Sequence, residues 1–512
     1  MADQQVIIIG AGPGGLAAAM LLAGAGVSVR VLERQRHVGG RTSAIEGEGF
    51  RFDLGPTFFL YGQVLESIFQ QVGRNLHDYL RLVKLDPQYR LVFGSGGEIV
   101  ATPRLEQLKA AVARICPADA ANLDGFMADN RKKLQLFKPC LENPFLGLGD
   151  VLSMHMLRLL PSLRPWNSLD RELGRYFSDP RVRLAFSFQA KYLGMSPFRC
   201  PSLFSILSFL EYEYGVWHPI GGCSAVTAAM AKAAQELGVQ LHLDEPVEEL
   251  LFEGRRAVGV RTNRASYRGL SVVINADFAH AMTHLVPDHL RRRWTDRKIA
   301  RKKFSCSTFM LYLGMKGTYD DQPHHNIYLS HDYKQNLADI EDLHRLSEDP
   351  SIYVQNACVT DPSLAPAGMS TLYVLAPVTH QHANVHWDAE KAQFRRRVLG
   401  QLPHLGFKDV EERMVFERVI TPDDWNRSAS LHLGATFSLA HNFGQMLHLR
   451  PRNRFEDLDG VYLVGGGTHP GSGLPVIFES ARITTRLMLK DMGISSGRPA
   501  PQGAELAESG SR

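Results

Sequence analysis

The chain has 512 residues, more than one ordinary hydrophobic core, so two domains or one elaborated domain are expected. The formal net charge is only +4 and no stripe of interleaved basic and aromatic residues occurs, which argues against a nucleic-acid partner. The six cysteines form no C-x-x-C pair, which argues against a disulfide framework or a zinc site and suits a reducing cytosol.

An apolar run opens the chain, from Val6 to Glu33, with the sequence VIIIGAGPGGLAAAMLLAGAGVSVRVLE. By hydropathy alone this run is long enough to span a bilayer. Its repeated glycines and Pro13 suit a turn better than a spanning helix. The short segment before it carries Asp3 instead of the basic cluster that begins a secretory signal. We therefore expect neither a membrane anchor nor an export signal here.

The same run predicts a strand–turn–helix–strand unit. Val6–Ile9 has the β-branched composition of a buried parallel strand. Gly10–Gly15 then forms the pattern G-x-G-x-x-G. Leu16–Ala25 predicts a helix that ends at Gly26. A second strand is expected over Val27–Leu32, which completes the order of elements found in a dinucleotide site.

The glycines of this turn have separate predicted roles. Gly10 permits the tight turn, Gly12 lets the backbone approach a pyrophosphate, and Gly15 lets the helix pack on the strand, with Gly14 in the same turn. The start of the helix offers free N–H groups and a positive dipole end to phosphates. Glu33 stands where a carboxylate accepts hydrogen bonds from ribose hydroxyls. We therefore predict a dinucleotide site.

The sequence after Glu33 favours FAD over NAD. Arg34 begins the segment RQRHVGGR, in which a flexible Gly39-Gly40 pair precedes Arg41. The Arg41 guanidinium is expected near the pyrophosphate, because arginine suits phosphate oxygens. A single-domain NAD site does not need this additional arm, whereas the larger FAD is commonly wrapped by one.

The pieces of the FAD-binding domain are expected to be separated along the chain. We expect an α/β fold with a Rossmann-like, discontinuous FAD-binding domain made of residues 1–75, 216–285 and 440–495. The sequence between these pieces mixes strands and helices and is expected to form an inserted α+β substrate domain, residues 76–215 and 286–439. Residues 496–512 are rich in Gly, Ser, Pro, Ala and Glu and predict a disordered tail.

Two segments are candidates for contact with a membrane surface. Residues 150–166, DVLSMHMLRLLPSLRPW, are too short and too charged to span a bilayer but suit an interfacial helix; a core helix has the same pattern. Residues 290–304, LRRRWTDRKIARKKF, are strongly basic. In isolation they suit a solvated helix face, and near an anionic leaflet they add attraction that salt screens.

A second strand–glycine–helix unit lies near the other end of the sequence. Val461–Val464 predicts a strand, Gly465–Gly467 a turn, and a helix is expected from about Pro475. The start of that helix is expected to direct its dipole toward the flavin. The alternative is a purely structural turn. This second unit lies hundreds of residues from the first. It therefore supports FAD independently of the first motif.

No convincing catalytic base stands out in the sequence, so the catalytic residues stay unassigned. Asp179 precedes Pro180 and is expected to cap a helix. Glu211 and Glu213 suit solvated or structural roles, and His469 is expected to shape the flavin loop.

A metal site is not expected. His380, His382 and His386 have an i, i+2, i+6 spacing that is not a recognised zinc arrangement, and no cysteine or carboxylate pattern completes it. No Ser-His-Asp signature and no Walker loop are present.

Several motifs together resemble a known family. The segments VIIIGAGPGGLAAA, ERQRHVGGR, FDLGPTFF, AFSFQAKYLGMSPF, EYEYGVWHPIGG, CVTDPSLAPAGMSTLYVLAPV and YLVGGGTHPGSGLP occur in the order found in bacterial-type phytoene desaturases. That family is the carotenoid desaturase branch of the amine-oxidase-like flavoproteins. The similarity runs from about residue 4 to 491, and GTHPGSGLP is its most specific element.

The resemblance implies FAD as cofactor and a set of contacts to it. By position these are Gly10, Gly12, Gly14, Gly15, Glu33, Arg34, Gly40, Arg41, Val247, Gly466, Gly467, Leu474, Pro475 and Val476. The segment GLPVIFESAR departs from the more usual GIPGV type, so bulkier side chains are expected at the flavin end.

The resemblance also implies an activity. The chain is expected to desaturate a linear C30 or C40 isoprenoid of the phytoene, diapophytoene or squalene type, with hydride transfer to flavin N5. Oxygen or a quinone is expected to reoxidise the flavin, and the protein is expected in the cytoplasm, peripherally on a membrane surface. A carotenoid isomerase, an amine oxidase and a non-enzymic polyene-binding flavoprotein are the alternatives.

Overall fold

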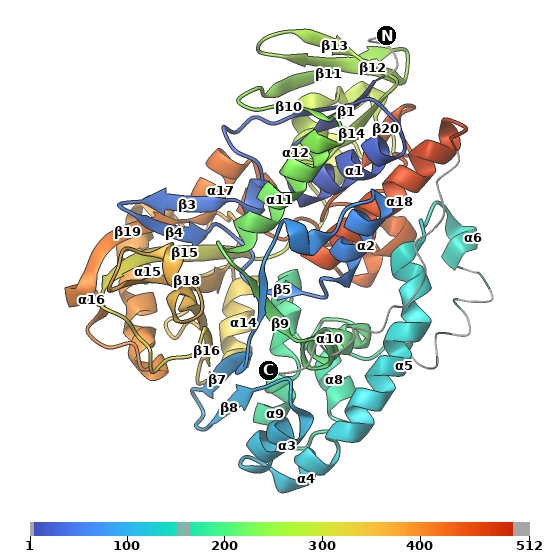
Figure 1. Cartoon of the computed structure of the whole chain (residues 1–512). Coiled ribbons are helices and arrows are strands. Elements are labelled where there is room, and N and C mark those ends of the chain that lie inside the picture. The colour runs from blue at the N-terminus through green and yellow to red at the C-terminus, as the bar shows by residue number, and fades with distance from the viewer. Residues whose placement is uncertain are drawn as a thin grey trace.

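The structure is a computed structural model that describes residues 5–494 except 152, 154, 155, 157, 158, 160 and 162 (Figure 1). The predicted tail, residues 496–512, lies outside the described residues. The segment 150–166 includes all seven of the internal exceptions, so its predicted helix is described only in part. Its described side chains Met156, Leu159 and Leu163 are buried in the core of the helical region, as in a core segment.

A five-stranded parallel sheet forms the first layer of the fold, in the order β10-β2-β1-β14-β20. Its strands are β1 (Val6–Ile9), β2 (Val29–Leu32), β10 (Gln240–His242), β14 (Ser271–Ile274) and β20 (Val461–Leu463). The central strand β1 is fully buried, as its β-branched residues predict. Each predicted piece of the FAD-binding domain contributes to this sheet, while the domain boundaries themselves stay a prediction.

Three helices surround the first βα turn. They are α1 (Pro13–Gly24), α11 (Cys223–Glu236) and α18 (Leu474–Asp491), and α1 packs against both of the others. Figure 1 shows α18, in red, beside α1, in blue, although they come from opposite ends of the chain. A small antiparallel sheet lies beyond the parallel one, with β11 (Val247–Glu253), β12 (Arg256–Thr262) and β13 (Ser266–Arg268).

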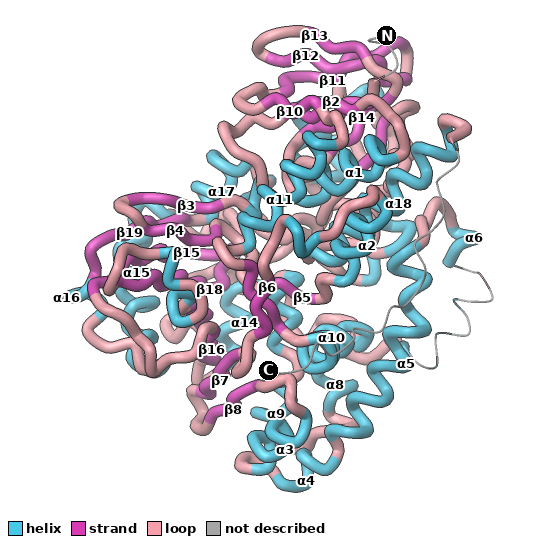
Figure 2. The backbone as a smooth tube through the Cα atoms, viewed as in Figure 1, coloured by secondary structure: helices cyan, strands magenta, loops and turns pink. Residues whose placement is uncertain are grey.

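A seven-stranded mixed sheet forms the second large layer, in the order β19-β15-β18-β17-β16-β7-β8. Its strands are β7 (Tyr89–Phe93), β8 (Glu98–Ala101), β15 (Ser307–Lys316), β16 (His325–Leu329), β17 (Ile352–Gln355), β18 (Met369–Val378) and β19 (Met414–Ile420). Both predicted insertions contribute strands, and Figure 2 shows this sheet well separated from the parallel one.

Shorter elements connect these layers. Two small sheets consist of β3 (Ala44–Gly47) with β4 (Phe50–Asp53), and of β5 (Phe59–Leu60), β9 (Val216–Pro219) and β6 (Leu82–Lys84). The helices of the first insertion are α3 (Leu105–Ala113), α4 (Pro117–Ala121), α5 (Leu123–Glu142), α6 (Leu148–Val151), α8 (Leu169–Leu173), α9 (Pro180–Ala185) and α10 (Ile206–Tyr214). The remaining helices are α2 (Gln63–Gln71), α12 (Phe278–Leu285), α13 (Asp296–Ile299), α14 (Tyr333–Glu341), α15 (Trp387–Gln401), α16 (Val410–Arg413) and α17 (Pro422–Ala429).

The strand–turn–helix–strand prediction for the first residues is confirmed. The helix begins at Pro13, earlier than the expected Leu16, because proline is favoured in the first turn and Gly12 supplies the N-cap. No helix in the described part of the chain is both long and apolar enough to cross a bilayer.

The basic segment 290–304 differs from the single helix face that its sequence suggested. Only Asp296–Ile299 is α-helical, while Arg291 and Trp294 are buried. The Arg291 guanidinium donates to the Trp294 carbonyl (2.7 Å) and to the Asp296 carboxylate (2.7 Å). Part of the basic charge is therefore used inside the fold.

Candidate cofactor and active site

A cavity of about 740 Å³ begins where the parallel strands end and reaches the seven-stranded sheet. Ile9 and Leu32, the last residues of β1 and β2, line one end of it. Met310 and Leu375, from β15 and β18, line the other end. Because the carboxyl ends of parallel strands are where α/β folds bind ligands, this cavity is the candidate site.

The start of α1 forms an anion-binding cradle at the cavity wall. The first intrahelical hydrogen bond runs from Leu16 N to Gly12 O (3.0 Å), so the N–H groups of Gly14 and Gly15 have no helical acceptor. Gly12 caps the helix without a side chain, and the first turn carries no acidic residue. These features fit a dinucleotide pyrophosphate.

The glycines of this turn divide into two groups. Gly10 and Gly12 line the cavity, and Gly10 has φ +96°, which favours glycine. Gly14 and Gly15 have no room for a side chain. A Cβ on Gly15 would lie 2.2 Å from the Gly10 carbonyl oxygen, and one on Gly14 would lie 2.6 Å from Val464 Cγ1. The close approach of Gly14 to Val464 therefore packs the glycine turn after β1 against the end of β20, just before the second glycine turn.

Asn275, directly after β14, holds this turn from the opposite side. Its side-chain amide donates to the Gly10 carbonyl oxygen (3.1 Å), and its backbone N–H donates to Ile9 O (2.9 Å). Asn275 also lines the cavity. Asn275 was not predicted as a site residue, because its bond to Gly10 joins two segments 265 positions apart.

Glu33 is buried at the cavity wall, at the end of β2, as predicted. Its carboxylate accepts hydrogen bonds from the backbone N–H groups of Ala11 (2.7 Å) and Gln35 (2.9 Å). An ionised carboxylate has about four lone-pair sites, so it retains capacity for further donors such as ribose hydroxyls. The two backbone bonds fix the carboxylate beside the glycine turn.

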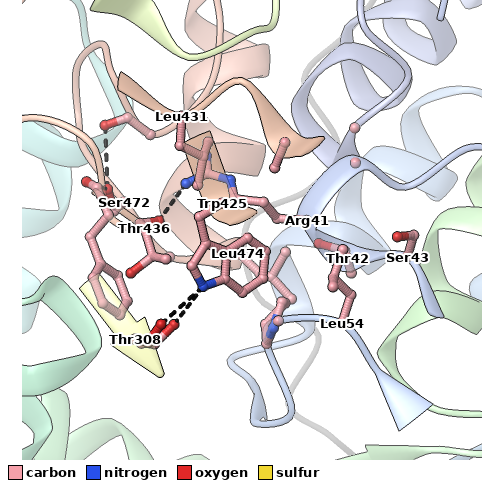
Figure 3. Close-up of a pocket in the computed structure, with 18 of the residues that line it drawn as sticks. Arg41, Thr42, Ser43, Leu54, Thr308, Trp425, Leu431, Thr436, Ser472 and Leu474 are labelled. Carbon is pink, nitrogen blue, oxygen red and sulfur yellow. Dashed lines mark hydrogen bonds between the residues drawn. The ribbon is translucent and has the colours of Figure 1, made fainter. Parts of the chain in front are cut away.

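The arm after Glu33 lies against the cradle. The Gly39 N–H donates to Ala11 O (2.8 Å), and Gly40 and Arg41 line the cavity. Burial lowers the pKa of Arg41, and the nearby Asp277 carboxylate partly offsets this effect. Arg41 Nη1 donates to the Thr436 carbonyl oxygen (2.5 Å), an interaction shown in Figure 3.

Arg34 also lines the cavity and ties the arm to the loop after α17. Its guanidinium donates to the Ser430 hydroxyl and to the Ser428 carbonyl oxygen. Val247, the first residue of β11, lines the cavity as well. Arg34 and Val247, both expected as cofactor contacts, therefore line the same space.

The start of α18 faces the same cavity. Leu474, Pro475 and Val476 form its first turn and line the cavity, and the N-cap is Gly473 with φ +108° and no side-chain cap. No acidic residue occurs in this turn, so its positive dipole end is not neutralised there. Gly466 also lines the cavity.

Gly467, in contrast, does not line the cavity. A Cβ there would lie 2.6 Å from Phe278 Cβ, so the absence of a side chain serves packing. The walls between these elements include Trp425, whose indole N–H donates to the Thr308 carbonyl and hydroxyl oxygens (3.1 Å each), as Figure 3 shows.

The far part of the cavity is mainly apolar but contains a few polar side chains. Its apolar lining includes Phe58, Leu207, Leu210, Ile327, Ile352 and Leu375. Lys191 also lines it and pairs with Glu341 (3.3 Å). Tyr192, Tyr353 and Tyr373 also line the same space. Such a lining suits a long apolar ligand with few polar contacts.

The weaker sequence candidates lie elsewhere. Asp179 caps α9 by accepting the Arg181 N–H (2.8 Å), which confirms the capping interpretation. The His469 imidazole is within hydrogen-bond distance of the Cys140 and Asn143 carbonyl oxygens (3.1 and 3.0 Å). Within residues 5–494, apart from the undescribed positions, no group of three or more metal-ligating side chains could hold an ion.

Glu211 is fully buried, although it does not line the cavity. Its carboxylate accepts hydrogen bonds from Gln189 (2.9 Å) and Tyr89 (3.1 Å). Burial raises the pKa of Glu211 to about 7, and these hydrogen bonds offset only part of that rise. Glu211 is therefore not solvated, and its structural role stays a prediction. Glu213 is on the surface side and pairs with Arg131 (2.7 Å).

Comparisons with known proteins agree with this geometry. A family model described as flavin containing amine oxidoreductase matches residues 13–489. The chain is 44% identical to 4,4'-diapophytoene desaturase (4,4'-diapolycopene-forming) of Methylomonas sp., over 95% of each chain. It is 40% identical to all-trans-zeta-carotene desaturase of Myxococcus xanthus, over 96% of this chain and 94% of that one. A solved structure of putrescine oxidase with putrescine shares the fold at TM-score 0.60 and 16% identity, covering 96% of this chain and 99% of that one.

Proposed function

The chain belongs to the flavin containing amine oxidoreductase family, and within it to the carotenoid desaturases; from this premise we propose that it installs conjugated double bonds in a linear isoprenoid. Its cofactor is FAD. The observation that carries the substrate proposal is the single cavity, which is continuous from the glycine turn after β1 to an apolar end against the seven-stranded sheet.

FAD supplies the hydride acceptor for this reaction, which no side chain can replace. In the proposed arrangement the N–H groups at the start of α1 hold the pyrophosphate and Glu33 accepts the ribose hydroxyls. Arg41 would add positive charge beside them, and Val247 would contact the adenine end. The start of α18, Leu474–Val476, would hold the isoalloxazine end, where its dipole would favour negative charge.

The substrate in this proposal is an acyclic polyene of the diapophytoene or phytoene class. The named activities of the similar desaturases support this class, and the apolar lining gives it room. An amine substrate is disfavoured, because burying an ammonium group against the mainly apolar far end of the cavity would cost desolvation free energy. An isomerase remains the second candidate, because the same cavity would also hold a conjugated carotenoid.

Pigment formation tests the proposal directly. The chain is expressed with a pathway that forms 4,4'-diapophytoene and, separately, with one that forms phytoene, and the polyenes are identified by absorption and mass. Conjugated product from either pathway supports the desaturase. Absence of new double bonds from both, with FAD bound to the purified protein, would contradict it and favour the isomerase.

We also propose peripheral contact with a membrane, where such substrates dissolve. The side chains of Leu148 in α6 and Phe443 are 65% and 54% exposed. The basic segment 290–304 lies beside the same region, because Arg293 donates to the His448 carbonyl oxygen (2.7 Å) and Lys303 N donates to Gln445 (2.9 Å). Exposed apolar and basic groups together are typical of binding to an anionic leaflet. Oxygen or a quinone is the proposed electron acceptor.

A further inference from the structure

A chain of hydrogen bonds begins at the cavity wall and ends on a buried imidazole. The Thr57 hydroxyl and the Tyr353 phenol, both lining the cavity, lie 2.7 Å apart. The Tyr353 phenol oxygen lies 2.8 Å from Nδ1 of His325, a residue with no exposed surface. The cavity therefore presents a phenol whose proton has a direct path to a base.

The sheet register explains why these two side chains meet. Tyr353 in β17 pairs with Ile327 in β16, so His325, two residues before Ile327, is its diagonal neighbour on the same face. Thr57 reaches the phenol from the loop after β4. The three groups therefore come from three segments that the fold brings together.

The hydrogen-bonded groups of Thr57, Tyr353 and His325 lie between the predicted cofactor end of the cavity and its apolar end. Thr57 follows Gly55 closely, and a Cβ on Gly55 would lie 2.6 Å from the Arg41 carbonyl oxygen. The loop that carries Thr57 is thus packed on the predicted cofactor arm. On the other side, Tyr353 pairs in the sheet with Leu375, which lines the apolar end.

We propose that Tyr353, backed by His325, takes the proton that the substrate loses during desaturation, a role that rests on the proposed function. FAD, when bound, would supply the two-electron oxidant that accepts a hydride from one substrate C–H bond. The neighbouring C–H bond breaks, its electron pair becomes the new C=C π bond, and its proton passes to Tyr353 Oη. The phenol's own proton passes to His325 Nδ1. Tyr353 is then the catalytic residue and His325 the positioning residue.

The surroundings of His325 suit a group that gains a proton briefly. Its ring stacks on Phe58 with the centroids 4.1 Å apart and the planes 11° apart, and an aromatic face attracts a cation. Burial, together with the nearby His218, lowers the pKa of His325 well below its ordinary value, so the resting imidazole is neutral. A weak base is sufficient, because a C–H bond next to an allylic cation is strongly acidic.

Other titratable groups pack around the same ring. The His324 ring lies 4.4 Å from the His325 ring, and the His218 ring lies 4.7 Å from that of His324. His218 Nε2 is 3.3 Å from the Asp361 carboxylate, a counter-charge at the end of this cluster. The imidazoles extend from the cavity toward the loop of Asp361, which offers the proton a direction in which to leave.

Tyr353→Phe tests the role, because it removes only the hydroxyl. Tyr319→Phe is the matched control, since Tyr319 is also buried but does not line the cavity, and its phenol donates to the Lys408 carbonyl oxygen (3.2 Å) instead of to an imidazole. His325→Asn keeps a hydrogen-bonding group near Nδ1 without a basic nitrogen. The FAD-bound proteins are assayed with 4,4'-diapophytoene and with phytoene in phosphatidylcholine vesicles.

General acid–base catalysis typically contributes about 10²- to 10⁴-fold, so we expect Tyr353→Phe to lower kcat about 100-fold or more while KM changes little. The primary isotope effect for substrate deuterated at the proton-losing carbon should rise, which a structural role would not cause. His325→Asn should act in the same direction, and Tyr319→Phe should stay close to wild type. The visible spectrum of bound FAD and the melting temperature report whether each variant is intact.

Wild-type turnover by Tyr353→Phe or by His325→Asn would overturn the inference and leave the proposed function standing. So would an equal loss in Tyr353→Phe and Tyr319→Phe without a change in the isotope effect. Absence of conversion by the FAD-bound wild-type protein would overturn the proposed function and this role with it.

Discussion

The Asn275 side-chain amide donates a hydrogen bond to the Gly10 carbonyl oxygen over 3.1 Å, joining residues 265 positions apart in the sequence. The bond closes the glycine turn from the side of β14. It also places Asn275 against Gly12 and Gly15, where an added Cβ would lie 3.1 and 2.8 Å from its amide nitrogen. The cradle is therefore built by a residue outside the motif that predicts it.

Asn275→Leu should weaken FAD binding. The change leaves the Gly10 carbonyl oxygen without its side-chain donor, and an unsatisfied buried acceptor costs roughly 1–3 kcal/mol. We expect about a tenfold or greater rise in the Kd for FAD, measured by flavin fluorescence. Asn384→Leu is the control, because Asn384 makes the same kind of bond, to Leu343 O (3.1 Å), on an exposed segment. Equal FAD affinity in Asn275→Leu and wild type would contradict the role of this bond.

Glu33→Gln should also reduce FAD affinity with little change in shape. The amide replaces one acceptor oxygen by a donor, so it cannot accept both the Ala11 and Gln35 N–H groups and a ribose hydroxyl. We expect a loss of about 1.5–3 kcal/mol of binding, the range for hydrogen bonds to charged groups. Glu46→Gln is the control, since Glu46 lines the same cavity but is exposed and pairs with Arg51. If both variants bind FAD like wild type, Glu33 is not a ribose ligand.

Gly15→Ala and Gly125→Ala should have opposite effects on stability. A Cβ on Gly15 would lie 2.2 Å from a backbone oxygen, so the helix must move from the strand, whereas nothing lies within 4 Å of a Cβ on Gly125 in α5. In an exposed helix interior, Gly→Ala gains roughly 0.8–1 kcal/mol. Chemical denaturation should show lower unfolding free energy for Gly15→Ala and higher for Gly125→Ala. Stability equal to wild type for Gly15→Ala would disagree with the close helix–strand contact.

Glu211 should make stability fall as pH rises. The pKa of Glu211 is raised from 4.5 to about 7, so between these values the folded carboxyl holds a proton that the unfolded chain has released. The free energy of unfolding should therefore decrease across this window by as much as about 1.4 kcal/mol per pH unit from this group. Glu211→Gln should remove that slope in denaturation curves from pH 5 to 8. Glu213→Gln, next to it on the surface, should keep the wild-type slope; a wild-type slope in Glu211→Gln would refute the assignment.

Phe443→Asp should weaken binding to anionic vesicles. A full apolar side chain contributes roughly 1.5–3 kcal/mol when buried, and a carboxylate adds repulsion from the leaflet. We expect a clear loss of co-flotation with phosphatidylserine vesicles, and weaker wild-type binding at high salt. Val415→Asp is the control, because Val415 is similarly exposed but lies on β19, in the second layer. Equal flotation of the two variants would count against this face.

A site residue can be predicted from the sequence when its partners lie close to it along the chain. Glu33 and Gly10 are predictable, because strand, turn and acid follow one another within a few tens of residues. Asn275 and Thr436 are not, since their roles depend on bonds across hundreds of residues. Tyr353 was missed for the same reason, because its partner is set by the register of two strands.

The two glycine-rich motifs also show where local reasoning stops. The sequence assigned Gly14 and Gly467 to the cofactor. A Cβ on either would meet side chains of the fold, while the N–H of Gly14 stays among the groups proposed to hold the pyrophosphate. A glycine pattern reports close approach of the backbone but not what approaches it. Close packing and ligand binding can both require glycine, so the sequence alone does not distinguish them.

The contact of Gly14 with Val464 has a consequence for biosynthesis. A nascent polypeptide leaving the ribosome exposes the first glycine turn early, but β20 and α18 emerge only after some 450 further residues have been translated. Until then the parallel sheet lacks its last strand, and the flavin compartment lacks a wall. Cofactor capture should thus wait until β20 and α18 have been translated.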